Sequence, residues 1–129
     1  MIYWDTCLVI YDVAGVAPFA QRLRAAHETI TDGDLRVSDL VRLECLVLPL
    51  RLRHAGLLSA YQTGFATLET LELDRDTYLP ATELRAEHRL KTPDALHAAC
   101  AIRHGCRELW TDDGRFSCVG DRLTIRVIS

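Results

Sequence analysis

The sequence lacks the features that mark several large classes of protein. No stretch approaches the ~20 consecutive apolar residues that a membrane-spanning helix needs, and the richest one, residues 45–50, is short and contains Pro49. The first residues show neither the basic segment nor the small-residue cleavage site of a secretory leader, so we expect a cytoplasmic protein with no membrane partner. The five cysteines are odd in number and show no CxxC spacing, which disfavours a disulfide framework and a structural zinc site.

Lysine is nearly absent, since the basic residues are fourteen arginines and Lys91. With a net charge of −3 and a pI near 5.9, the chain as a whole offers little attraction to a polyanion. Local charge decides such contacts, however, and basic side chains gather at residues 51–54 and 85–91. Each group is either a solvated helix face or part of a surface that binds phosphates.

What the sequence does contain is an alternation of β-prone and helical segments. Its 129 residues suit a single domain over residues 1–129. We expect strands at residues 2–4, 35–37, 70–73, 108–111 and 123–128, and helices at residues 18–27, 38–54, 57–68, 76–90 and 93–105. This alternation predicts an α/β fold, with a mainly parallel sheet of about five strands and helices on both faces.

Local signals place some helix ends and faces. Ser38 and Thr92 suit the cap positions of the helices that follow them. Pro49 should kink or interrupt the second predicted helix, because proline lacks the N–H that the helix ladder uses. Leu79 and Leu84 belong to the apolar face expected for the fourth predicted helix.

Carboxylates stand where the predicted strands end. Asp5 follows the first strand, Asp112 and Asp113 follow the fourth, and Asp94 opens the helix before the fourth. Simpler explanations exist: an acid in a first helical turn gains ~0.3–1 kcal/mol from the helix dipole, and Asp-Asp-Gly suits a turn. Functional sites in doubly wound sheets lie at the carboxyl ends of strands, near a switch in strand order. One edge of the sheet would gather all four acids, so we interpret them as parts of one site.

Glu44 is the most informative acid. On a helix, its neighbours three and four positions away are Leu40, Val41, Val47 and Leu48. An ionised carboxylate among apolar side chains is costly unless a cation or strong donors meet it. A salt bridge to an arginine such as Arg42 is one solution, and a metal-binding cluster is the other.

Clustered carboxylates cannot all stay ionised at neutral pH without positive charge among them. An all-oxygen ligand set suits Mg²⁺ or Mn²⁺ rather than zinc. Such a cation can bind a phosphodiester, generate hydroxide from bound water and stabilise the leaving oxygen. The sequence offers no better nucleophile, because it has no GxSxG turn, no P-loop and no HExxH pair.

Four stretches, in order along nearly the whole chain, resemble the PIN-domain nucleases and, within them, the VapC-type toxins. They are Ile2-Tyr-Trp-Asp5-Thr6, Val37-Ser38 leading to Glu44, Thr92-Pro-Asp94-Ala-Leu-His97-Ala98, and Leu109-Trp-Thr111-Asp-Asp113-Gly-Arg-Phe116. The helix start T-P-D-A-L-H-A and the loop T-x-D-x-x-F are the specific ones.

The resemblance implies a PIN-like three-layer fold and a role for each matched position. The implied catalytic residues, which also hold Mg²⁺ or Mn²⁺, are Asp5, Glu44, Asp94 and Asp113. The matched hydroxyl positions, which would support the acids or a bound phosphate, are Thr6, Ser38 and Thr111. Asp112 stands at a variable position, and its role stays open. Arg115 stands where many relatives carry a further acid, and Phe116 is expected to pack the loop.

The resemblance also implies an activity and partners. The activity is endonucleolytic cleavage of single-stranded or looped RNA by metal-activated water. The partners are a second copy of the chain, in a homodimer, and a small antitoxin whose tail enters the groove and silences the toxin. Our candidates for RNA binding, which flank the acid-bearing segments, are Arg51, Arg53, Arg85, Arg89 and Lys91.

Three rival functions remain. A PIN-domain nuclease of RNA processing would carry the same residues without being a toxin. A non-catalytic PIN-fold binding module should have lost acids, and all four are present here. A haloacid-dehalogenase-like phosphatase needs a second aspartate two positions after Asp5, where Cys7 stands.

Overall fold

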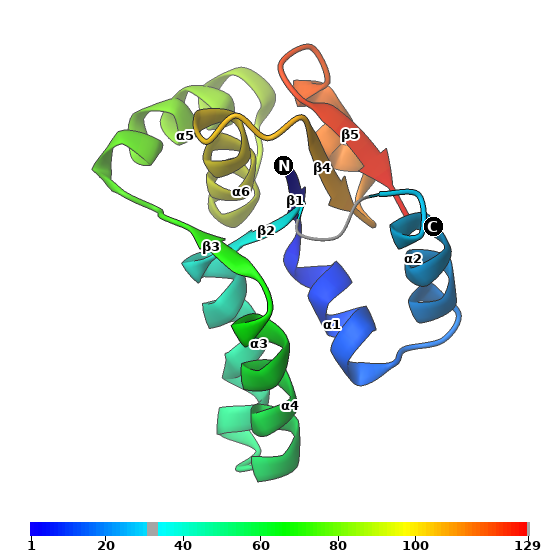
Figure 1. The fold of residues 1–129 in the computed structure, drawn as a ribbon. Coiled ribbons are helices and arrows are strands. Elements are labelled where there is room, and N and C mark those ends of the chain that lie inside the picture. Colours follow the sequence, from blue (N-terminus) through cyan, green and yellow to red (C-terminus); the bar gives the residue numbers. More distant parts are fainter. Residues whose placement is uncertain (31–33, 129) are drawn as a thin grey trace.

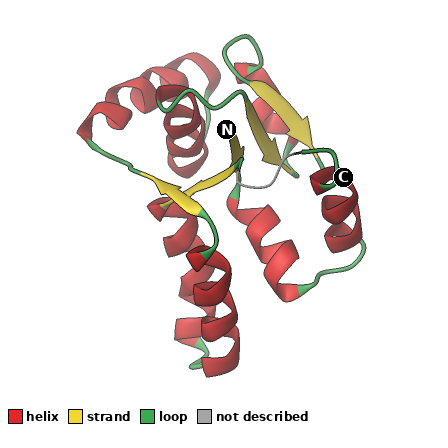
Figure 2. Cartoon of the chain, in the orientation of Figure 1, coloured by secondary structure: helices red, strands yellow, loops and turns green. Residues whose placement is uncertain are grey.

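The computed structural model describes residues 1–30 and 34–128, and these form a layered α/β fold (Figure 1, Figure 2). The strands are β1 (Ile2–Trp4), β2 (Leu35–Ser38), β3 (Glu69–Leu71), β4 (Glu108–Thr111) and β5 (Thr124–Val127). The helices are α1 (Thr6–Ala14), α2 (Phe19–His27), α3 (Asp39–Arg51), α4 (Ala55–Ala66), α5 (Arg75–His88), α6 (Thr92–Arg103) and the 3₁₀ helix η1 (Gly114–Val119). The domain predicted over residues 1–129 includes residues 31–33 and 129, which lie outside the described part.

The strands form one sheet in the order β3-β2-β1-β4-β5, and all of the pairings between neighbours are parallel. The prediction of a mainly parallel sheet of about five strands is confirmed. The chain runs outward from β1 through β2 to β3, and then places β4 on the other side of β1. The switch in strand order therefore lies between β1 and β4, whose carboxyl ends form the crevice where such folds bind ligands.

Neighbouring residues of β1 face opposite layers of the fold. The Tyr3 hydroxyl contacts His97 of α6, whereas the Trp4 ring lies 6.0 Å from that of His27 in α2. Successive strand residues point to opposite faces of a sheet, so α5 and α6 cover one face and α1 and α2 the other (Figure 1). Helices on both faces were predicted and are confirmed.

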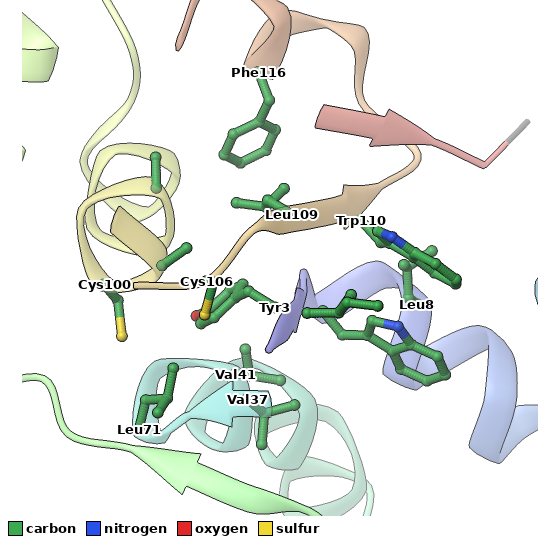
Figure 3. Packing of buried hydrophobic residues seen from close by; sticks show 14 of the residues in the cluster. Tyr3, Leu8, Val37, Val41, Leu71, Cys100, Cys106, Leu109, Trp110 and Phe116 are labelled. Carbon is green, nitrogen blue, oxygen red and sulfur yellow. The ribbon is translucent and has the colours of Figure 1, made fainter. Parts of the chain in front are cut away.

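The core lies between the sheet and these helices. Tyr3, Val37 and Leu109 are fully buried, and Phe116, which was expected to pack its loop, is 1% exposed (Figure 3). Burying each such side chain contributes ~1.5–3 kcal/mol. The helices α3 and α4 pack on each other and project from the body of the molecule as a hairpin (Figure 1). No helix within residues 1–30 or 34–128 is long and apolar enough to cross a membrane.

The helices predicted from the sequence do not include one at Thr6–Ala14, where the structure has α1. The run Thr-Cys-Leu-Val-Ile-Tyr is apolar and partly β-branched, so it lacks the polar side of an amphipathic helix. Its helical signals lie at the ends instead: the Asp5 side chain caps the first turn, and Gly15, with φ of 66°, ends the helix.

Other expectations need smaller corrections. Pro49 does not interrupt α3, which continues to Arg51, because a proline so near the end removes only one hydrogen bond of the ladder. The cap residue of α6 is Lys91, whose backbone is extended, and Thr92 is already helical. Leu79 is 67% exposed, because α5 turns its Thr77–Ala81–Leu84 side towards the sheet.

Candidate active site

Asp5 occupies the carboxyl end of β1, in the crevice beside β4, and is 8% exposed. Its Oδ1 accepts a hydrogen bond of 2.8 Å from the Thr6 amide, and its Oδ2 accepts one of 2.8 Å from the Thr111 hydroxyl at the end of β4. The Thr111 oxygen also accepts the Asp113 amide at 3.0 Å. Two strands, one helix start and the following loop thus fix the Asp5 carboxylate.

Glu44 comes to the same place from α3. Its Oε1 accepts the Thr6 hydroxyl at 2.8 Å and lies 2.6 Å from Nε2 of His97. The same Nε2 lies 3.7 Å from Oδ1 of Asp5, so the two acids flank one imidazole. Burial raises the pKa of Glu44, but the hydrogen bonds from His97 and Thr6 outweigh it and hold the pKa below its ordinary value.

The surroundings predicted for Glu44 are wrong in part. Val41 is fully buried, but Val47 is 41% and Leu48 54% exposed, because α3 belongs to the projecting hairpin and turns that side to solvent. The arginine alternative also fails, since Arg42 donates to the Thr70 hydroxyl at 2.9 Å instead. Histidine and threonine donors, rather than an arginine, meet the Glu44 carboxylate.

Asp94 lies in the first turn of α6 and is half-buried. Burial, the charge of Asp5 and, to a smaller extent, the charge of Asp113 raise its pKa, while Arg115 works in the opposite direction. These carboxylates are therefore close enough to repel one another. A group of acids that disfavours its own ionisation is where a cation is most strongly bound.

Asp113 caps the 3₁₀ helix η1 at the exit of β4 and is held by Arg115. The Arg115 Nε lies 2.8 Å and its Nη2 2.6 Å from Oδ2 of Asp113, which lowers the pKa of this carboxyl. Asp112 accepts a hydrogen bond from the Tyr11 hydroxyl of α1. The open question about Asp112 thus receives a structural answer: it ties the β4 exit loop to α1.

No three histidine, cysteine or acidic side chains in the described ranges are grouped so as to hold a metal ion. Glu44 is turned to His97, and Asp113 is turned to Arg115. The donor set still fits a hard divalent cation, because it consists of carboxylate oxygens around an acid of raised pKa. The residues that would hold such a cation are Asp5, Glu44, Asp94 and Asp113.

His97 is not among the site residues predicted from the sequence. In the structure it is 1% exposed, and both ring nitrogens are engaged: Nε2 with Glu44 and Nδ1 with the Tyr3 hydroxyl at 2.6 Å. The available signal was spacing, because His97 follows Asp94 by three positions and shares its helix face. Of the predicted supporting hydroxyls, Thr6 and Thr111 contact acids, whereas Ser38 contacts Tyr3 at 2.7 Å.

The candidate RNA-binding residues fall into two groups. The junction group, at the link between α5 and α6 beside Asp94, consists of Arg85, Arg89 and Lys91. Lys91 is near enough to help lower the pKa of Asp113. The tip pair, at the far end of the α3–α4 hairpin, consists of Arg51 and Arg53. Arg51 is seven residues beyond Glu44, which is ~10 Å along a helix.

Comparison with known proteins identifies one family and several solved structures with the same fold. The family model of the PIN domain matches residues 2–121. A toxin–antitoxin complex from Klebsiella pneumoniae has a TM-score of 0.80 at 20% identity, over 100% of this chain and 98% of that one. VapBC2 from Rickettsia felis, bound to a promoter DNA fragment, has a TM-score of 0.78 at 19% identity, over 100% of both chains.

A third solved structure is VapC20 from Mycobacterium tuberculosis, a sarcin–ricin loop cleaving toxin. It has a TM-score of 0.75 at 18% identity, over 93% of this chain and 95% of that one. At these identities the three structures show that the fold is shared. No curated protein matches the chain.

Proposed function

The chain belongs to the PIN-domain family, and from this premise we propose that it is a metal-dependent endoribonuclease and the toxin of a toxin–antitoxin pair. One observation carries the nuclease proposal. At the switch between β1 and β4, Asp5 and Glu44 lie 3.7 and 2.6 Å from the same imidazole nitrogen of His97, and burial together with the charges of Asp5 and Asp113 raises the pKa of the neighbouring Asp94. This arrangement suits a cation and a phosphodiester together.

The chain's own residues prepare the site for that chemistry. Thr6 and Thr111 hold Asp5 by both carboxylate oxygens, so that the central acid of the crevice is rigid. When bound, Mg²⁺ or Mn²⁺ would supply hydroxide from its water and stabilise the leaving oxygen. The junction group would bind flanking phosphates, because it lies at the link that leads into α6 just before Asp94.

The test is cleavage of an unstructured RNA by the purified protein. EDTA should abolish cleavage, and added Mg²⁺ or Mn²⁺ should restore it. Asp94→Asn should remove the restored activity, and Asp121→Asn, an exposed acid outside the site, should retain it. Undiminished cleavage in EDTA, or equal activity of the two variants, would disprove the proposed chemistry.

A cavity on the α1–α2 side of the sheet, lined by none of the four acids, is a candidate contact for the antitoxin. It measures about 500 Å³, and among its lining residues are Trp4, Val13, Leu23, His27 and Leu68. The Trp4 indole Nε1–H is buried and finds no acceptor among the described residues. An apolar side chain and a carbonyl of a bound antitoxin would fill the cavity and accept this bond. The three similar solved structures are two toxin–antitoxin complexes and a toxin.

Growth assays distinguish the toxin from a PIN-domain nuclease of RNA processing. Induced expression of the chain in bacteria should arrest growth, and Asp94→Asn should not. Co-expression of the protein encoded by a short neighbouring reading frame should relieve the arrest. Normal growth with an active nuclease would favour the RNA-processing alternative.

The projecting hairpin supports the proposed homodimer. Leu43, Val47 and Leu50 recur at helical spacing along α3 and are between 41% and 59% exposed. Exposed apolar stripes of this kind mark protein contacts. Replacing Leu43 with Asp should convert a dimer in light scattering to a monomer, and a wild-type monomer at micromolar concentration would contradict the proposal.

A further inference from the structure

Beneath the acids lies a buried chain of polar side chains that no step above uses. It runs from the Ser38 hydroxyl to the Tyr3 hydroxyl at 2.7 Å, from Tyr3 to Nδ1 of His97 at 2.6 Å, and from Nε2 of His97 to Oε1 of Glu44 at 2.6 Å. The Thr6 hydroxyl completes it at 2.8 Å from the same Oε1. Ser38, Tyr3 and His97 are each 1% exposed or less.

One donor order satisfies every atom of this chain. The Glu44 carboxylate only accepts, so Nε2 of His97 and the Thr6 hydroxyl donate to it. Nδ1 of His97 then accepts from Tyr3, and the Tyr3 oxygen accepts from Ser38. The Ser38 oxygen accepts the Val41 amide at 3.5 Å, which is its capping bond in α3. For a neutral imidazole, the carboxylate at one end sets this order.

The chain connects parts of the fold that are far apart in sequence. Tyr3 and Ser38 belong to β1 and β2, Glu44 to α3, and His97 to α6, with separations of 35, 94 and 53 residues along the links. A shift of α3 against the sheet would therefore break bonds at buried atoms, each costing about 1–3 kcal/mol. The sheet face below the acids thereby fixes where α3 holds Glu44.

The hydrogen bonds that Glu44 accepts from Thr6 and His97 meet the same oxygen, Oε1. The side chain is 30% exposed on the hairpin base, and an unanchored glutamate there would sample many rotamers. Ordering such a side chain costs up to about 2 kcal/mol. With Oε1 anchored, this cost is met on folding, and Oε2 accepts no hydrogen bond from the described residues.

We infer that Tyr3 and His97 are positioning residues, which hold the Glu44 carboxylate ready for the divalent cation of the proposed nuclease. The inference rests on the proposed function. It gives a reason for burying a tyrosine hydroxyl and a histidine below the acids: partners that orient a metal-binding side chain change metal affinity by about 10–100-fold.

The test measures Mn²⁺ binding to the metal-free protein by calorimetry, with unfolding temperature recorded for each variant. His97→Leu should weaken Mn²⁺ binding by about 10–100-fold, and Tyr3→Phe by about tenfold. His97→Gln should recover a large part of the affinity, because its amide offers one donor and one acceptor. Single-turnover cleavage at saturating Mn²⁺ should recover more in Tyr3→Phe than in His97→Leu.

Thr77→Val is the matched control for a structural effect. Thr77 is fully buried and donates to Asp74 at 3.1 Å at the start of α5, outside the hydrogen-bonded chain that reaches Glu44. It should lower the unfolding temperature as much as Tyr3→Phe does and leave Mn²⁺ affinity unchanged. Should His97→Leu fail to fold, Tyr3→Phe and His97→Gln still decide the question.

The outcomes separate this inference from the proposed function. Folded variants whose Mn²⁺ affinity stays within twofold of a tightly binding wild type would overturn the positioning role alone. Equal losses of affinity in Thr77→Val and Tyr3→Phe would overturn it as well, because stability would then explain both. A wild type that binds no Mn²⁺ and cleaves no RNA would overturn both proposals.

Discussion

Replacing Asp94 with Asn separates the two explanations of this acid. Burial and the charges of Asp5 and Asp113 raise its folded-state pKa, so its ionised form disfavours the folded protein. This shift sets the direction in which stability changes with pH. Between the unfolded value near 3.9 and the raised folded value, the folded state binds more protons, and stability falls as pH rises through that window. Asn removes this unfavourable charge at neutral pH.

The two explanations differ in direction and size. If Asp94 only complements the dipole of α6, Asn costs about 0.3–1 kcal/mol, which lowers the unfolding temperature of a chain of this length by about 1–5 °C. If repulsion in the acid cluster dominates, the metal-free variant melts at the wild-type temperature or above. Added Mn²⁺ at a hundred times its Kd should stabilise the wild type by about 2.7 kcal/mol, and Asp94→Asn far less.

The assay is thermal unfolding in EDTA and in Mn²⁺, each at pH 4.5 and 7.5. Asp39→Asn is the control, because Asp39 is an exposed acid in the first turn of α3 and reports the dipole contribution alone. Wild type should gain stability on acidification through the window relative to Asp94→Asn. If Asp94→Asn and Asp39→Asn melt equally far below wild type in EDTA, the cluster explanation of Asp94 is refuted.

Three further changes test other contacts. Thr111→Val removes the hydrogen bonds to Asp5 and from the Asp113 amide at a fully buried position. We expect denaturant unfolding to show a free energy of unfolding lower by about 1–3 kcal/mol. A loss below about 0.5 kcal/mol would mean that water replaces these bonds. Arg115→Ala removes the hydrogen bonds that lower the pKa of Asp113. The stability that this pair contributes above the unfolded pKa of Asp113, and that is lost as pH falls through its folded pKa, should therefore shrink, by a small amount because the pair is exposed. An unchanged acid unfolding curve would contradict this. Alanine in the junction group should reduce the slope of log RNA-binding constant against log salt concentration by about 0.7 per lost contact. Alanine in the tip pair should leave this slope unchanged. Equal responses of the two groups would show that the hairpin tip binds RNA too.

The order of strands and helices was predictable because each element has a local signal. Ser38 caps α3 as its position suggests, accepting the Val41 amide, and Gly105, with φ of 73°, follows the end of α6. The helix α1 was not predictable in the same way. Its buried Leu8 and Val9 reflect packing against the sheet and α2, and this tertiary burial hides the amphipathic period from the sequence.

Some parts of the site could likewise be predicted from the sequence, and others could not. Asp5 and Asp113 could be placed because strand ends in a parallel sheet meet at one edge. The partner of Glu44 could not, since His97 lies 53 residues away and reaches it only through the packing of α6 on the sheet. The pairing of Asp113 with Arg115 spans two residues, but their i, i+2 spacing brings the side chains together only because η1 starts there. Sequence spacing identifies the acids, and tertiary packing selects what neutralises them.

That selection leaves one acid different from the others. Asp5 accepts the Thr6 amide and the Thr111 hydroxyl, Glu44 accepts His97 and Thr6, and Asp113 accepts Arg115. Asp94 accepts no hydrogen bond from any residue in the described ranges, and it is the member of the group whose pKa is raised. In the proposed nuclease, a cation would relieve the charge of Asp94, which Arg115 and His97 offset only in part. Asp5, Glu44 and Asp113 are held in place without metal by the groups that donate to them. Asp94 lacks such a donor among the described residues, so a bound metal would change the surroundings of Asp94 most.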